Sequence, residues 1–128
     1  MIREYSKDSK KQLSKNFNVS EMKCHCSYPE CVSTPIDDYL ILRLQKERDI
    51  LKTPIVIDSG YRCQRHNREV GGKKGSYHLI GKAADIHVKG LTVKQMLDIF
   101  EGFDGVGWYK GRHFIHCDVR GYRARFHG

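Results

Sequence analysis

Apolar positions with helical spacing predict the first long element of this chain. They recur from Ile36 to Leu51, which is typical of one buried helix face. The Thr34-Pro35 pair before them suits a helix start, because threonine caps helices and proline fits the first helical position. Pro54 ends the pattern. We therefore predict a helix that begins at Pro35 and ends before Pro54.

Further along the chain, one more helix and several short strands are expected. Thr92 and Gln95 have the spacing of a capping box, so the second helix is predicted over residues 91–100. Strand patterns occupy residues 55–57, 83–89, 105–109 and 113–119, the last two joined by a tight turn at Lys110-Gly111. This pattern predicts an α+β domain, with a short antiparallel sheet and two main helices packed against it.

The polar N-terminus differs from the rest of the chain. Residues 1–16 are expected to form a weakly ordered basic arm, and residues 17–128 the single domain. Apolar side chains at Phe17, Val19 and Met22 are expected to dock the arm's end on the core. Residues 60–82 combine several glycines with few aliphatic residues, and a long irregular segment in a small domain is usually functional.

Composition narrows the class of protein. With 128 residues, 39% hydrophobic and 30% charged, the chain is neither disordered, collagen-like nor a coiled coil. No apolar run is long enough to span a bilayer, so we expect no membrane insertion. The formal net charge of +8 favours an anionic partner. No basic block or Arg-aromatic pattern indicates nucleic acid in particular.

The cysteines leave two interpretations open. Cys24, Cys26 and Cys31 lie close together, whereas Cys63 and Cys117 stand alone. The cluster would hold a structural zinc ion if a fourth ligand, such as Cys63 or His66, came from elsewhere. Plain reduced thiols are the alternative, and the spacing is not that of a standard zinc finger.

Two segments carry residues suited to a catalytic metal. His78 and Asp85 flank Gly81, which can turn the chain back, and Asp85 lies on the polar face of the strand predicted over residues 83–89. His116 and Asp118 share one face of another predicted strand. If these strands are neighbours, His78, Asp85 and His116 converge. Two imidazoles and a carboxylate suit zinc and leave a fourth position for water.

These residues also form a motif. The pattern Ser76-x-His78-x-x-Gly81-x-Ala83-x-Asp85 resembles that of the zinc D-Ala-D-Ala carboxypeptidase family, within the wider group of lysostaphin-type, D-Ala-D-Ala and hedgehog-type metallopeptidase folds. The resemblance extends from about residue 17 to residue 123. It includes further matching segments at Ser59-Gly60-Tyr61-Arg62, His66-Asn67, Gly71-Gly72 and His116-x-Asp118-x-Arg120.

The resemblance implies a role for each matching residue. It makes His78, Asp85 and His116 the zinc ligands and Ser76 a supporting residue. Arg62 would bind a substrate carboxylate or the polarised carbonyl. The alternative for Arg62, from the residue type alone, is a surface ion-pair partner. The family's general base lies three residues before the last ligand, at His113. Asp118 is the competing candidate, or it orients a ligand instead.

The function that the resemblance implies is hydrolysis of bacterial peptidoglycan peptides, at a D-Ala-containing or L-Ala-D-Glu bond, with zinc-bound water as the nucleophile. The anionic cell wall would then be the partner of this basic chain, and a monomer is expected. Without an apolar segment after the basic N-terminus, we expect cytoplasmic synthesis. Such an enzyme would act on the wall after release, as a phage endolysin does, or within a virion. A non-catalytic zinc-containing binding module of the same fold is the alternative.

Overall fold

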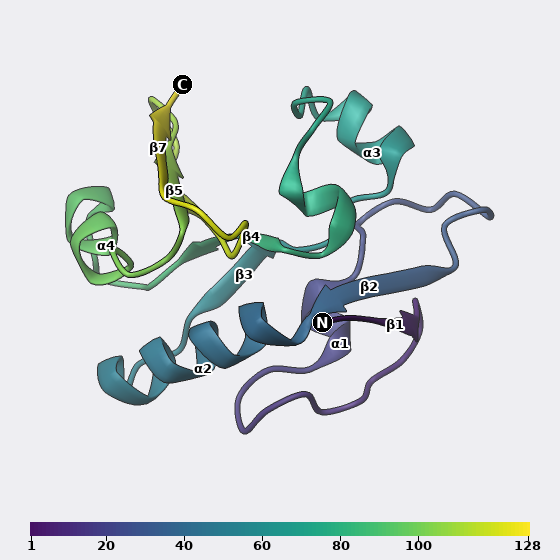
Figure 1. The fold of residues 1–128 in the computed structure, drawn as a ribbon, viewed down its shortest axis with the longest axis horizontal. Helices are drawn as coiled ribbons and strands as arrows, with labels where there is room; N and C mark the ends of the chain where they lie inside the picture. The colour runs from purple at the N-terminus through teal and green to yellow at the C-terminus, as the bar shows by residue number, and fades with distance from the viewer.

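Two β-sheets organise the fold in the computed structural model, which describes residues 1–128 (Figure 1). The smaller sheet pairs β1 (Ile2–Ser6) with β2 (Ser33–Asp37). The larger has the order β3-β4-β6-β5-β7, formed by β3 (Val56–Ser59), β4 (Ala83–His87), β6 (Ile115–Asp118), β5 (Gly105–Trp108) and β7 (Ala124–His127). All neighbours are antiparallel except β5 and β7, which are parallel. The predicted α+β class is thus confirmed, and the sheet is mixed at one edge.

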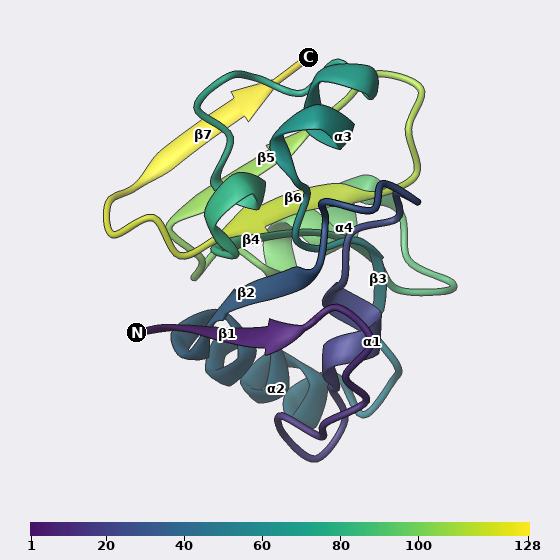
Figure 2. The ribbon, with the colours of Figure 1, turned by 90° about the vertical axis from the view of Figure 1, so that its right-hand side faces the viewer.

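Four helices and one 3-10 turn surround these sheets. They are α1 (Val19–Met22), α2 (Asp38–Leu51), α3 (Gln64–Glu69), the 3-10 helix η1 (Tyr77–Ile80) and α4 (Val93–Ile99). In Figure 2, α3 and η1 lie on the viewer's side of the five-stranded sheet and α4 lies behind it. The capping box predicted at Thr92 and Gln95 begins α4, with both hydrogen bonds formed. None of the helices has the length and apolar character needed to cross a membrane.

The start of α2 differs from the prediction. Thr34 and Pro35 belong to β2, opposite Tyr5 and Glu4 of β1, and the helix begins only at Asp38. Asp37 is the actual cap, since its side chain accepts a hydrogen bond from the backbone N–H of Tyr39 at 2.8 Å. A proline is tolerated here because β2 has a neighbour on one side alone.

The N-terminal residues also differ from the expected weakly ordered arm, because residues 2–6 form β1. The backbone N–H of Lys7 continues the pairing by donating to the carbonyl of Val32 at 2.9 Å. Phe17, Val19 and Met22 are buried in the core, as expected. The N-terminus is therefore part of the folded layer that carries β2.

The core lies behind the five-stranded sheet. Ala84 and Ile86 of β4 and Ile115 and Cys117 of β6 point into it, against residues of α2 and α4. The alternating residues of the same strands point to the opposite face. This is the face of the sheet on which α3 and η1 lie (Figure 2). The alternation predicted for residues 83–89 is confirmed along β4, where it separates an apolar face from a polar one.

Candidate functional site

The polar face of β4 and β6 brings the predicted ligands together. Asp85 lies directly opposite His116 in the antiparallel pair. His78 comes from η1, and its Nε2 lies 3.1 Å from Asp85 Oδ1, which is 3.4 Å from Nδ1 of His116. One ligand atom from each residue lies within 4.8 Å of the others, and all three residues are buried. The donor set is the one that zinc accepts in proteins.

The outer nitrogen of each imidazole is held by a different partner. Nδ1 of His78 lies 2.7 Å from the carbonyl oxygen of Gly60, and only an N–H at Nδ1 can bond to that acceptor. Nε2 of His116 lies 2.6 Å from Asp118 Oδ2. This leaves Nε2 of His78 and Nδ1 of His116 to face Asp85, an orientation typical of metal-binding histidines. Sequence reasoning did not identify the Gly60 carbonyl, because a backbone acceptor leaves no pattern.

The two carboxylates at the site are held in the ionised form. Burial alone would raise the pKa of Asp85, but hydrogen bonds from His116 and His78 outweigh burial and hold that pKa well below its usual range. Burial likewise opposes ionisation of Asp118, whose pKa is held low by His116 and Arg120. A negative charge therefore lies on each side of the His116 ring, which favours binding of a cation there.

Arg62 contacts the site through three groups on its guanidinium. Its Nη2 donates to Asp85 Oδ2 at 2.9 Å, and its Nε donates to Ser59 Oγ at 3.1 Å. Its Nη1 donates to Asn67 Oδ1 at 3.0 Å. Five N–H groups are available on an arginine, so two remain for another acceptor. Arg62 thus orients the Asp85 carboxylate and still lines the cleft described below.

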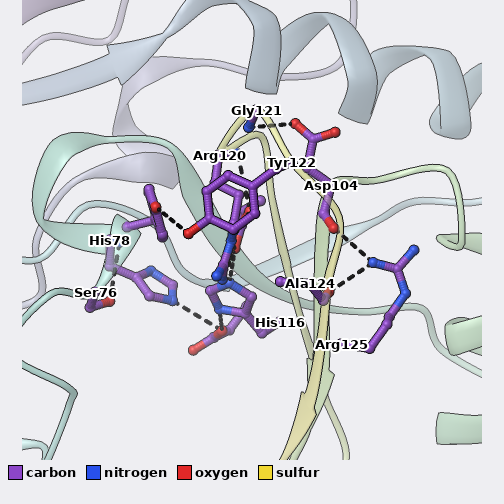
Figure 3. Close-up of polar contacts among 12 residues, drawn as sticks. Ser76, His78, Asp104, His116, Arg120, Gly121, Tyr122, Ala124 and Arg125 are labelled. Carbon is purple, nitrogen blue, oxygen red and sulfur yellow. Dashed lines mark hydrogen bonds and ion pairs between the residues drawn. The ribbon is translucent and has the colours of Figure 1, made fainter.

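Asp118 and Arg120 form a second ion pair behind His116. The carboxylate of Asp118 is fully buried and accepts from Arg120 Nη2 at 2.7 Å. The guanidinium of Arg120 lies 4.5 Å from the centre of the Tyr77 ring. Figure 3 shows His78 and His116 side by side, with Arg120 and Tyr122 next to them. Asp118 is thus placed to orient His116, with Oδ2 2.6 Å from Nε2 of that ring.

A glycine of β5 and an aromatic residue of β7 pack around Asp118 and His116. Gly105 lies opposite Asp118 in the β5–β6 ladder, and a Cβ there would overlap the Asp118 carboxylate. Phe126 of β7 packs on His116, with ring centres 5.1 Å apart. Residues 124–127 were not predicted as a strand, because four residues carry little periodicity and the parallel partner is distant in sequence.

Ser76 lies at the start of η1, two residues before His78. Its hydroxyl accepts a hydrogen bond from the backbone N–H of His78 at 3.2 Å, which begins η1. Gly81 ends η1 in the left-handed region, with φ 74°, so the chain turns back into β4 as predicted. The motif thus places His78 and Asp85 on consecutive elements that face each other.

His113 lies apart from the other predicted site residues. Its side chain is exposed just before β6, whereas Arg112 and Phe114 line the cleft. No hydrogen bond joins it to His78, Asp85 or His116. The turn before β6 therefore does not direct its side chain inward, and its assignment as general base has no geometric support. Asp58 also lines this region, and its Oδ2 lies 2.7 Å from Nδ1 of His87, which is outside the lining.

A cleft of about 920 Å³ opens over the three predicted ligands. Its lining includes more cationic than anionic side chains: Arg62, Lys73, Arg112, Arg120 and Arg125 against Asp58 and Asp85. The positive charge favours an anionic ligand.

The three clustered cysteines lie outside this cleft and meet Cys63, the residue that follows Arg62.

Comparisons with known proteins agree with this geometry. The chain is 35% identical over 95 residues to the peptidoglycan L,D-endopeptidase MepK of Escherichia coli, which covers 66% of this chain and 51% of that protein. It is 30% identical over 83 residues to a probable MepK of Haemophilus influenzae, covering 59% of this chain and 45% of the relative. The chain thus spans about half the length of these curated relatives.

The matching family covers both the site and most of the fold. Residues 15–118 match the family model described as Peptidase M15. This range contains the two imidazoles and the carboxylate that converge on the polar face of β4 and β6, and excludes β7. The chain belongs to the Peptidase M15 family.

Proposed function

We propose that this chain is a zinc-dependent peptidase that hydrolyses peptides of bacterial peptidoglycan. The convergence of His78, Asp85 and His116 beneath an open cleft carries the proposal. Family membership and the MepK relatives, which are named as peptidoglycan L,D-endopeptidases, support the reaction and the substrate class.

The residues present fit a zinc ion. Both imidazoles direct one nitrogen toward Asp85 while a neighbouring oxygen fixes the other, so the tautomers suit metal binding without rearrangement. Three protein ligands leave a position for an exchangeable group, as catalytic zinc sites require. When bound, zinc polarises a carbonyl and lowers the pKa of coordinated water.

The protein's own residues supply orientation and charge. Asp118 holds the His116 ring, and Arg62 holds Asp85 while keeping two N–H groups for an acceptor in the cleft. A guanidinium binds a carboxylate or a carbonyl oxygen in a fixed planar geometry. The cationic rim therefore suits a short peptide that carries carboxylates. We propose that the scissile bond involves a D-amino acid.

Digestion of purified peptidoglycan tests the function. The protein is incubated with and without a chelator, zinc is restored, and the new termini are identified by mass spectrometry. We expect chelator-sensitive release of peptide fragments, recovery with zinc, and no release by His116→Ala. Binding to peptidoglycan with no new termini in any sample would instead indicate a non-catalytic module. The identity of the termini also defines the bond.

A further inference from the structure

A second cluster of potential metal ligands lies outside the proposed catalytic site. The Sγ atoms of Cys24, Cys26, Cys31 and Cys63 all lie within 4.8 Å of one another. Three of these residues lie in the connection between α1 and β2, and Cys63 caps α3. Cys24 and Cys31 are buried and the other two are half-buried. The only remaining cysteine, Cys117, belongs to the core.

The spacing of the sulfur atoms matches a tetrahedral metal site. With zinc–sulfur bonds of about 2.3 Å, the edge of a ZnS₄ tetrahedron is about 3.8 Å. Cys63 Sγ lies 3.8 Å from Cys24 Sγ and 3.7 Å from Cys26 Sγ. One sulfur therefore has two neighbours at the tetrahedral distance. A disulfide would need about 2.05 Å between sulfurs.

Neighbouring donors stabilise negative charge on three of the four sulfur atoms, those of Cys24, Cys26 and Cys63. The backbone N–H of Cys63 donates to Cys24 Sγ at 3.4 Å, and that of His66 donates to Cys63 Sγ at 3.4 Å. The ammonium of Lys7 lies 3.3 Å from Cys26 Sγ and also donates to the Cys26 carbonyl at 2.8 Å. Such donors favour thiolates, the form that binds metals.

We propose that Cys24, Cys26, Cys31 and Cys63 bind one structural zinc ion. Four thiolates favour zinc over hard cations, which prefer oxygen ligands, and they leave no open position, so this site binds no substrate. Metal binding releases the thiol protons to solvent. The ion joins the loop after α1 to the start of α3.

This position gives the second metal a part in shaping the catalytic site. Cys63 follows Arg62, which holds Asp85. The backbone N–H of Tyr61 donates to the carbonyl of Met22 at 2.8 Å, next to the cysteine loop. With the metal bound, the ion would hold Cys63 at one end of this segment, and the cysteine loop next to Met22 at the other. The segment carries Arg62 and Gly60, the partner of His78.

Metal content and cobalt spectroscopy test the proposal on the whole chain. Protein purified under reducing conditions is analysed by native mass spectrometry as wild type and as the His78→Ala/His116→Ala variant. We expect one zinc per chain to persist in the variant. Cobalt added to its metal-free form should give a sulfur-to-cobalt charge-transfer band that saturates at one equivalent. This result is independent of any peptidase activity, so it separates this proposal from the proposed function.

Cysteine variants identify the ligands. In the His78→Ala/His116→Ala background, Cys26→Ser should lose the remaining zinc and the saturating band, whereas Cys117→Ala should keep both. Circular dichroism checks that each variant is folded. The proposal is overturned if the folded parent variant binds no metal and shows no charge-transfer band, or if Cys26→Ser retains both. A disulfide within the cluster of the reduced, purified chain would also overturn it.

Discussion

Asp118 and His113, the two candidates for the general base, occupy different positions in the fold. Asp118 is buried against Nε2 of His116, whereas His113 is exposed outside the cleft. We predict that Asp118→Asn lowers zinc affinity and turnover by about 10–100-fold, since partners that orient metal-binding histidines contribute to this extent. His113→Ala should keep both within a few-fold. Chelator competition and peptidoglycan digestion provide the measurements, and a large loss in His113→Ala with normal Asp118→Asn would reverse the two roles.

Arg62 is tested by a change that keeps its charge. Lysine cannot reach Ser59, Asn67 and Asp85 at once, because it lacks the planar guanidinium. We expect Arg62→Lys to impair turnover and to lower the free energy of unfolding by about 1–3 kcal/mol, the usual result when buried polar groups lose their partners. Urea denaturation and digestion assays measure the two effects.

The control for Arg62 is its exposed neighbour on the same segment. Arg65 pairs with Glu30 at the surface, so Arg65→Lys should change stability little. If Arg62→Lys and Arg65→Lys had the same turnover and the same free energy of unfolding, the contacts of Arg62 with Ser59, Asn67 and Asp85 would contribute to neither quantity.

The sequence predicts these residues unequally, for physical reasons. Strand alternation and a glycine turn, which are local features, make His78, Asp85 and His116 candidates, and the resemblance of their motif to a peptidase family implies that they are the ligands. The Gly60 carbonyl and the Asn67 contact with Arg62 depend on tertiary packing, so no residue pattern indicates them. His113 lies outside β6, in the turn before it, so the alternation of the strand does not fix the direction of its side chain.

At the scale of elements, patterns within one segment were more informative than pairing between segments. The helix predicted over residues 91–100 and the two faces of β4 are confirmed because capping and alternation are local. Thr34-Pro35 fits the start of a helix, but the same pair also fits an edge strand. The partner strand β1, which decides between them, lies about 30 residues away, so the local pattern predicts the wrong element. The parallel pairing of β7 with β5 was missed for the same reason.

The turn at Gly81 permits a test of how η1 is fixed. Gly81 and Gly90 both have positive φ, 74° and 89°, but only a Cβ at Gly81 would overlap the carbonyl of Pro35. Alanine at either position costs about 1–2 kcal/mol in backbone strain. Gly81→Ala should therefore destabilise the protein clearly more than Gly90→Ala in thermal unfolding. If the two variants lost the same stability, the backbone of β2 at Pro35 would have moved away from the added Cβ with no loss of free energy.

At the scale of the whole molecule, one buried carboxylate joins the two sheets. Asp37 ends β2, and Lys82, just before β4, donates to its Oδ2 at 2.8 Å. The N-terminal ammonium lies 3.5 Å from its Oδ1. This contact connects the small sheet to the strand that carries Asp85. It was not foreseeable from the sequence, because residues 37 and 82 are remote and Asp37 was expected inside a helix.

The pH dependence of stability should report this contact. Burial alone would raise the pKa of Asp37, but the hydrogen bonds from Lys82 and the N–H of Tyr39 outweigh burial and hold that pKa below its usual range. The folded protein therefore binds the proton more weakly than the unfolded chain. The resulting stabilisation is present above the unfolded pKa of about 3.9 and is lost as the pH falls through the lower folded pKa.

Asp37→Asn separates this charge from the capping role, since asparagine also caps helices. Urea denaturation between about pH 6 and pH 2 should show a less steep loss of stability in Asp37→Asn than in wild type. Asp38→Asn is the matched control, because Asp38 pairs with Arg3 at the surface and should leave the slope almost unchanged. If Asp37→Asn kept the wild-type slope, the two sheets would not depend on the Asp37 charge to stay together. The acid sensitivity would then have to arise from Asp85 and Asp118, whose pKa values are also held low.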